Sequence, residues 1–375
     1  MPALPWRSLF IWAAAGTLVI VALVLHDVAE HGGRNPVSLI QAGTDGPSRD
    51  VVEQDFPGIE LPRGLGHDGQ QFYAIARAPM HLEDVARDLD RPLYRLQRPA
   101  LPWLAWALHP SGGGSGLIWS LFAVNVVALM LAGVAAGTIA VTWGGPVWVA
   151  ALIPLLPVGY VSLRITVADM LALALGLGAI ALDIRGRHRL ALLAGGLAVL
   201  SKESILLVLM GWAFVRRARA STALVVVSGV IAAGWWVLLR LLVHTDSPSI
   251  QEFGTPLRGL ADSLDLWWEG QELWAAASIA VAVALSAAVL LIRRSHPLVP
   301  STVLSLMFLV PLNINVLGFN LNGTRAVGPV TALALLALLT PNAGIAGEPS
   351  MKASGSARSE AVGQAGAGGS RAIRS

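Results

Sequence analysis

The sequence predicts an all-α, polytopic integral membrane protein with about ten transmembrane helices. Hydrophobic residues make up 55% of the 375 residues and charged residues 13%, whereas a soluble domain has roughly 25% charged residues. Several apolar runs reach the ~20 residues that a helix needs to cross a bilayer. The chain has no cysteine. This excludes disulfides, thiolate catalysis and cysteine-ligated metals, so chemistry depends on carboxylates, His, Lys, Arg and Tyr.

Residues 1–25 form the first predicted transmembrane helix. Arg7 precedes an apolar run over 8–25, which has the length of a signal peptide, but no clear small-x-small cleavage site precedes His26. We therefore interpret the run as an uncleaved helix. Residues 26–116 hold most of the acidic residues and no run long enough to span. They are expected to form a large loop or small cap with short interfacial helices.

The remaining apolar runs predict a multi-helix transmembrane domain over residues 117–340. Two runs are too short to cross alone. We expect a turn at 201–204 to join them as a hairpin; the alternative is one continuous helix over 190–215. Residues 341–375, rich in Gly, Ala and Ser, are expected to be a disordered tail. The apolar runs are 117–141, 147–161, 167–182, 190–200, 205–215, 223–243, 274–292, 298–317 and 327–339.

Basic residues predict the orientation of the chain in the membrane. Links with several arginines occupy 185–189, 216–219 and 293–294, and a turn at 201–204 would put them all on the side of Arg7. Because basic links favour the cytoplasm, both termini are expected inside and the first loop outside. The net charge of +3, from 26 basic and 23 acidic residues, is too small and too scattered to indicate nucleic acid as a partner.

The first loop contains the string GHDGQQFYAIAR at 66–77, which is the first candidate for chemistry. The glycines on either side of His67 and Asp68 allow a tight turn, which would place the Asp68 carboxylate beside a ligand at the head of a short helix. The alternative is that Asp68 only caps that helix in a surface loop.

Arginines precede an aromatic, proline-rich stretch in the same loop. Arg95 and Arg98 come just before 100–108 (ALPWLAWAL), where Trp103 and Trp106 have helical spacing and fit an interfacial helix. At headgroup depth these arginines could grip a lipid phosphate bidentately. The alternative is simple anchoring to lipid headgroups.

Ionisable residues within or near the apolar runs are further candidates, because charge at such depth is costly. The alternative is a structural ion pair, either Lys202 with Glu203 or Arg164 with Asp169. With the preferred topology all of them lie near the outer face, on the same side as Asp68, which suggests a lipid-anchored substrate with an anionic group. The candidates are Arg164, Asp169, Lys202, Glu203 and Arg325.

Three short stretches and one late arginine resemble those of bacterial multispan membrane glycosyltransferases of the GT-C superfamily, especially those of cell-surface glycopolymer formation. They are 68–76 (DGQQFYAIA), 94–102 (YRLQRPALP), 200–204 (LSKES) and Arg325. The phosphatidylinositol-glycan mannosyltransferases share a similar Trp-Asp-Gly-x-Trp-Tyr pattern after their first helix. This chain has His67 and Gln71 where relatives often carry an aromatic residue.

The resemblance implies a polyprenyl-phosphate-sugar donor, a glycan or lipid acceptor outside the bacterial cytoplasmic membrane, and transfer with inversion. Asp68 would then accept the proton of the attacking hydroxyl, and the cations would stabilise the departing phosphate. Tyr73, within the first string, joins the candidates for substrate binding. Asp55 is the second candidate for the base, since Glu53 and Asp55 are similar to an acidic pair that binds a divalent metal in some branches.

The cofactor and the function class stay open at this point. No cofactor is certain; oxygen ligands from Glu53 and Asp55 would favour magnesium, manganese or calcium. The main alternative to an enzyme is a transporter or lipid flippase for an anionic or lipid-linked substrate, because a broken hairpin at Lys202 and Glu203 is typical of a discontinuous-helix site. A structural membrane subunit with a capping loop is the third hypothesis.

Overall fold

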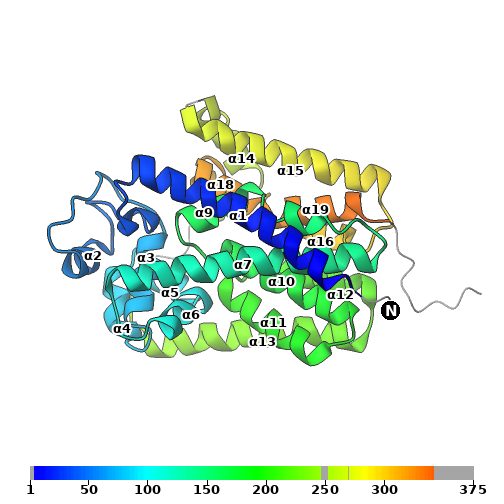
Figure 1. The fold of residues 1–375 in the computed structure, drawn as a ribbon, viewed down its shortest axis with the longest axis horizontal. Coiled ribbons are helices and arrows are strands. Elements are labelled where there is room, and N and C mark those ends of the chain that lie inside the picture. The colour runs from blue at the N-terminus through cyan, green and yellow to red at the C-terminus, as the bar shows by residue number, and fades with distance from the viewer. Residues whose placement is uncertain (1–3, 246–251, 269, 342–375) are drawn as a thin grey trace, which may run out of the picture. The chain divides into compact units, whose positions relative to one another are not determined.

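The computed structural model describes residues 4–245, 252–268 and 270–341. All regular secondary structure in these ranges is helical (Figure 1), which confirms the predicted all-α class. The backbone bridges there are isolated, one between Ala42 and Gly66 and one between Phe253 and Leu312. The predicted disordered tail, 341–375, lies outside the described residues apart from Pro341.

Long apolar helices run through the described part of the chain. Four segments are long and apolar enough to cross a membrane, and the pair α18–α19, bent by 44°, raises the number to at most five. These helices indicate association with a membrane, but by length and composition they do not show the ten spans that the sequence predicts. The four segments are α1 (Trp6–His31), α7 (Gly114–Thr142), α13 (Arg219–Leu242) and Gly270–Ile292, which ends with α15 (Leu273–Ile292).

The other apolar runs form shorter helices, because turns and prolines interrupt them. At about 1.5 Å per residue, helices of this length are shorter than the ~30 Å hydrocarbon core of a bilayer. They are α8 (Val149–Leu152), α9 (Pro157–Arg164), α10 (Asp169–Ile184), α11 (His188–Ser201), α12 (Ile205–Arg216), α16 (Val299–Met307), α17 (Ile314–Leu317), α18 (Asn320–Ala326) and α19 (Gly328–Leu339).

The predicted break between α11 and α12 is confirmed. Lys202, the residue directly after α11, has an extended backbone conformation (φ −160°, ψ 120°) that ends the helix. Asp183, near the end of α10, contacts both of the following helices: it pairs with His188 at 2.9 Å and accepts from Trp212 Nε1 at 2.8 Å. Since His188 begins α11 and Trp212 lies near the end of α12, the two helices form a hairpin. The alternative of one continuous helix is therefore wrong.

The basic links lie at one end of the helices. The Asp183 contacts join the 185–189 link to the 216–219 link, because Asp183 also accepts from Ser221 at 2.6 Å. The rings of Trp212 and Trp143 lie 6.2 Å apart, and those of Trp143 and His296 lie 5.1 Å apart. His296 follows the 293–294 link, so this link lies at the same end.

The first loop folds into short helices at the opposite end, on the left of Figure 1. α1 extends beyond its apolar run to His31, and Gly32 caps its end. α7 already begins at Gly114. The loop is thus a few residues shorter than 26–116. Its helices are η1 (Pro36–Leu39), α2 (Arg49–Asp55), α3 (Gly69–Arg77), α4 (Leu82–Val85), η2 (Ala86–Asp88), α5 (Pro92–Leu96) and α6 (Ala100–Leu108).

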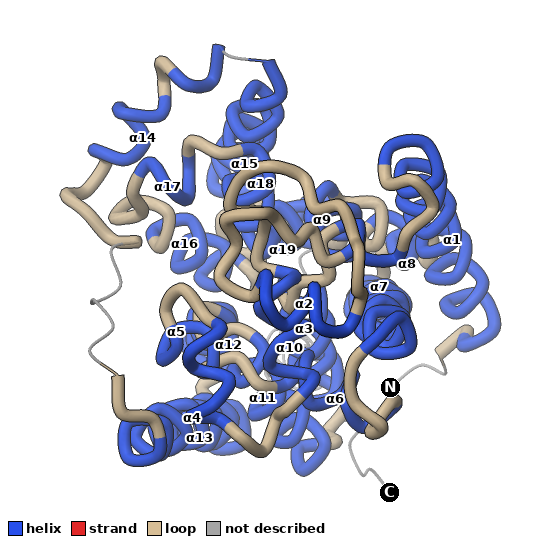
Figure 2. The backbone as a smooth tube through the Cα atoms, turned by 90° about the vertical axis from the view of Figure 1, so that its left-hand side faces the viewer, coloured by secondary structure: helices blue, strands red, loops and turns tan. Residues whose placement is uncertain are grey.

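Close packing of the helices fixes the frame on which this loop rests. α7 packs between α1 and α10, and α15 packs against α18 and α19 (Figure 2). A Cβ atom at Gly16 of α1 would lie 2.3 Å from the Ala151 carbonyl oxygen, and one at Gly133 of α7 would lie 2.4 Å from that of Ala150. Glycine at these positions lets the helices approach closely, as in many membrane bundles.

A second group of short helices faces the first loop. α14 (Arg258–Ser263) packs against α17 and η3 (Leu266–Trp268), and η4 (Gly270–Glu272) leads into α15. The bridge between Phe253 and Leu312 ties this group to the chain that follows α16. The bridged residues Phe253 and Leu312 and Val316 of α17 line the candidate site, and the first loop contributes Arg95 and Arg98 to the same site.

Candidate functional site

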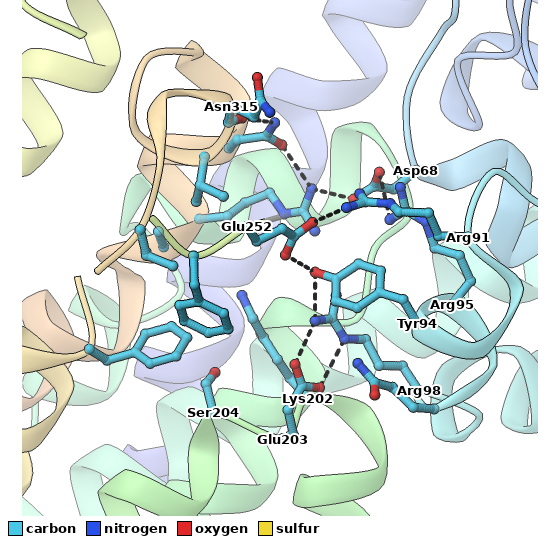
Figure 3. A pocket seen from close by; sticks show the side chains of 18 of the residues that line it. Asp68, Arg91, Tyr94, Arg95, Arg98, Lys202, Glu203, Ser204, Glu252 and Asn315 are labelled. Atoms are coloured by element: carbon cyan, nitrogen blue, oxygen red, sulfur yellow. Dashed lines mark hydrogen bonds and ion pairs between the residues drawn. The ribbon is translucent and has the colours of Figure 1, made fainter. Parts of the chain in front are cut away.

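A cavity of 640 Å³ lies between the loop helices and the ends of the longer helices (Figure 3). One side is charged and the other is apolar, so the cavity suits an amphipathic ligand. The charged residues are Asp68, Asp90, Arg91, Arg95, Arg98, Lys202, Glu203, Glu252 and Arg325. The apolar lining comes from Leu207, Phe253, Phe308, Leu312, Val316, Ala326 and Pro329.

Asp68 lies directly before α3 with its side chain in the cavity. Gly66 has a positive φ of 67°, and a Cβ atom there would lie 2.3 Å from the Gln41 carbonyl oxygen, so the turn requires glycine. The Asp68 side chain makes no capping hydrogen bond to α3, and the alternative of a simple N-cap is therefore wrong. Its carboxylate instead contacts Arg95 Nη1 at 2.9 Å and Arg325 Nη1 at 2.8 Å.

The electrostatics of Asp68 are dominated by these cations. Burial by itself raises the pKa of the carboxyl group, but Arg95 and Arg325 outweigh burial and hold the pKa well below its usual range. The Asp68 side chain is 21% exposed. Asp68 is therefore ionised at neutral pH, and as long as both arginines hold it, it is a weak acceptor of protons.

α5 directs the arginines of the first loop into the cavity. Pro92 stands in its first turn, where a proline is well tolerated. The guanidinium carbons of Arg91, Arg95 and Arg98 lie 4.8, 5.3 and 4.2 Å from the Tyr94 ring centroid, within cation–π range. The side chains of Arg95 and Arg98 are only 8% and 7% exposed. Such buried side chains do not fit the alternative of simple headgroup anchoring.

The helix ends on the far side of the cavity contribute a second cluster. Asp169, at the first residue of α10, binds Lys202 Nζ with one oxygen, and with the other it accepts from Arg325 Nε at 2.7 Å. Glu203 pairs with Arg98 at 2.7 Å. The alternative of a structural pair between Lys202 and Glu203 is therefore wrong, because the extended turn after α11 sends these two neighbours to different partners.

Arg164 does not line the cavity. Its guanidinium binds Asp27 and donates to the Ser38 carbonyl oxygen at 2.7 Å, so it joins the end of α1 to η1. The alternative of a structural pair with Asp169 is wrong, because Thr166 turns the chain between them at a positive φ of 47°. Arg164 thus holds the loop in place at this end and contributes no side chain to the cavity.

Tyr73 and Asp55 lie together, away from the cavity lining. The Tyr73 hydroxyl donates to Asp55 Oδ2 at 2.5 Å and accepts from the Gly114 amide at 2.6 Å. Arg77 Nε donates to the same carboxylate at 2.9 Å. Burial and then the bond to Asp55 raise the pKa of Tyr73. The structure therefore uses both residues to join α2, α3 and the start of α7, which corrects the expectation that they line a substrate site.

The acidic pair in α2 does not fit a divalent metal. Glu53 pairs with Arg49 at 2.6 Å, and Asp55 is held by Arg77 and Tyr73. A cation beside each carboxylate opposes binding of a metal ion. In the part of the chain that the structure describes, no group of three His, Asp or Glu side chains is placed to hold one.

Several residues of the cavity were not among the sequence candidates. Asp90 holds Arg95 through two bonds of 2.9 and 2.8 Å. Glu252 pairs with Arg91 at 2.8 Å and accepts from the Tyr94 hydroxyl at 2.6 Å. Arg91 and Tyr94 were also missed. Their helical spacing from Arg98, which was already a candidate, is a signal that could have identified both. Nothing local marks Glu252, because its partners lie in the first loop.

Comparison of the chain with protein-family models, with curated proteins and with solved structures finds no match.

Proposed function

We propose that this protein is a membrane glycosyltransferase that moves a sugar from a polyprenyl-phosphate donor to an extracytoplasmic glycan or lipid acceptor. The observation that carries the proposal is the two-sided cavity: four arginines, a lysine and four carboxylates, Asp68 among them, on one wall, and aliphatic and aromatic side chains on the other. The charged wall suits a sugar and its phosphate, and the apolar wall suits the first units of a prenyl chain. The resemblance to the GT-C superfamily supports the same reading.

The chemistry that we propose is a single inverting displacement. The acceptor hydroxyl oxygen forms a bond to the anomeric carbon while the bond from that carbon to the phosphate oxygen breaks. The phosphate leaves with the electron pair, and the hydroxyl proton passes to Asp68 as general base. Arg95, Arg325 and Lys202 stabilise the negative charge of the leaving phosphate.

We propose a setting in the bacterial cytoplasmic membrane, with both termini in the cytoplasm and the cavity outside. Support comes from the basic links, which gather at the end of the helices where Asp183 and His296 lie. The cavity lies at the other end, since Asp169 begins α10 and Lys202 follows the end of α11. We propose about ten crossings. This number counts α11 and α12 as one crossing each, and each of the broken segments α8–α9, α16–α17 and α18–α19 as one crossing.

One observation favours the transporter or flippase as a second candidate. The break at Lys202 lines the cavity, as discontinuous helices do at transporter sites. Transporter sites, however, lie near the bilayer midplane, whereas Lys202 lies at the end of its helices remote from the basic links. The position of the break therefore favours the enzyme.

The deciding experiment is sugar transfer in membranes that contain the protein. A panel of radiolabelled polyprenyl-phosphate sugars is offered, and we expect label from one of them to appear in a glycan or lipid product. Membranes with Asp68→Asn are the test variant. Membranes with Asp84→Asn are the matched control, since the Asp84 side chain is 72% exposed. Movement of a labelled lipid between leaflets without any transfer would favour the flippase instead.

A further inference from the structure

Arg95 and Arg325 share Asp68, and each is also held by a carboxylate of its own. Arg95 gives Nε and Nη2 to Asp90 at 2.9 and 2.8 Å, and Nη1 to Asp68 at 2.9 Å. Arg325 gives Nε to Asp169 at 2.7 Å and Nη1 to Asp68 at 2.8 Å. The two guanidinium groups are therefore oriented without the help of Asp68, and their Nη1 groups converge on the position of its carboxylate, whose place beside Arg95 is visible in Figure 3.

We propose that this position is the binding site for the donor's phosphate group, and that the incoming phosphate replaces the Asp68 carboxylate between Arg95 and Arg325. The identity of the ligand rests on the proposed function. The exchange itself rests on the geometry, because converging guanidinium N–H groups fit the oxygens of a phosphate as they fit those of a carboxylate.

Charge balance favours exchange over simple addition. Each cation of the cavity wall already has an acidic partner: besides the two shared arginines, Arg98 pairs with Glu203, Lys202 with Asp169 and Arg91 with Glu252. A further anion placed beside these pairs would meet carboxylates as close as the cations. If the phosphate takes the place of one carboxylate, the cations keep a partner and this repulsion is reduced.

Asp68 is the carboxylate best placed to move. Its side chain is 21% exposed, against 5% for Asp169, and it makes no capping bond to α3. Asp90 is 37% exposed, but it holds Arg95 through two bonds, and its departure would release the guanidinium group. The turn at Gly66 fixes the backbone, so rotation of the Asp68 side chain is enough for the exchange.

The exchange also makes Asp68 a better base. Between the two arginines its pKa lies well below the usual range. A phosphate in its place takes up the arginines and puts a negative charge beside the displaced carboxylate, and both changes raise the pKa. Asp68 would thus gain basicity only when a donor is bound, which protects the site from unproductive proton transfer.

The test is ligand binding by the purified full chain in detergent, measured by titration calorimetry. The probes are inorganic phosphate, farnesyl phosphate and farnesol. We expect Asp68→Asn to bind the phosphate probes about tenfold tighter than the wild type, because the competing charge is gone, with farnesol unchanged. Tighter binding of farnesyl phosphate than of inorganic phosphate would identify a lipid-linked phosphate as the ligand. Equal binding of the two probes would identify free phosphate.

Glu203→Gln is the matched control, since it removes a carboxylate of the same cavity that lies on Arg98 instead. We expect it to tighten phosphate binding less than Asp68→Asn does. Equal effects of the two variants, or weaker binding by Asp68→Asn than by the wild type, would overturn the exchange.

A second variant tests the proposal independently, in case Asp68→Asn does not fold. In Asp68→Ala the position between the arginines lacks its carboxylate, so added acetate should raise the thermal unfolding temperature of the variant and leave that of the wild type unchanged. The same response of both proteins to acetate contradicts the proposal. These readouts need no sugar transfer: a protein that passes them but transfers no sugar refutes the proposed function and not the exchange.

Discussion

Arg325 donates a hydrogen bond to Asp68 at 2.8 Å, across 257 residues of sequence. The contact joins α18, near the end of the described chain, to the turn before α3 in the first loop. It closes the charged wall of the cavity, since Arg325 also binds Asp169 of α10. Loop and helices are thus parts of one site, and this pair is where single substitutions are most informative.

Asp68→Asn tests the proposed base. The amide keeps the shape of the side chain but accepts no proton, so transfer should fall by about 10²- to 10⁴-fold. Initial rates with the radiolabelled donor measure the effect, with the amount of inserted protein determined in parallel. A folded variant that transfers at the wild-type rate would remove Asp68 from the mechanism.

Arg325→Lys separates charge from geometry. One ammonium group cannot reproduce the two directed bonds to Asp68 and Asp169, so the lysine variant should regain only part of the activity that Arg325→Ala loses. The ratio kcat/KM for the donor is the measurement. Equal, near-normal values for both variants would mean that Arg325 has only a structural role.

Asp55→Asn should act on stability instead of chemistry. The amide weakens the bonds from Tyr73 and Arg77 that join α2 to α3, and loss of a charged hydrogen bond costs ~1–3 kcal/mol. Thermal unfolding in detergent should shift downward, while transfer per folded molecule stays near that of the wild type. A large fall in transfer without a change in stability would return Asp55 to the list of candidate bases.

The stability that Asp68 contributes should depend on pH in a defined way. Its pKa in the folded protein lies below that of the unfolded chain, which is about 3.9 for Asp. The contribution is therefore complete above this value and is lost as the pH falls below it toward the folded pKa. Unfolding of the wild type and of Asp68→Asn should differ by a constant amount from pH 7 to about 4 and converge at lower pH. A difference that grows on acidification contradicts this sign.

Reporter tags test the orientation. A tag after residue 345 should report the cytoplasm, and a tag inserted at Gly112, where a Cβ atom would meet nothing within 4 Å, should report the outside. The reason is the gathering of the basic links at one end of the helices. Two tags in the same compartment would show that the proposed number of crossings is wrong.

The sequence was sufficient where a property depends on neighbouring residues. Composition and the apolar runs predict the all-α class and the association with a membrane, because a continuous apolar run long enough for a membrane helix is visible in the sequence itself. The break at Lys202 was also predictable, since a short polar stretch between two apolar runs disfavours a continuous buried helix. The position of Asp68 before α3 follows from the glycines around it. The number of membrane crossings stays a prediction, because turns divide several apolar runs into helices shorter than a bilayer.

Only the tertiary structure decided which charges meet. Lys202 is next to Glu203 in sequence but binds Asp169, Arg164 binds Asp27, and Tyr73 faces Asp55 and not the cavity. These partners depend on how helix ends that are distant in sequence pack together, and the hydrophobic periodicity of the sequence does not predict such contacts. Charge near a bilayer is costly, so the sequence by itself singled out Arg164 and Lys202 as functional candidates, with a structural ion pair as the alternative. The fold determined that the pairs would converge around one cavity, with Asp68 between Arg95 and Arg325.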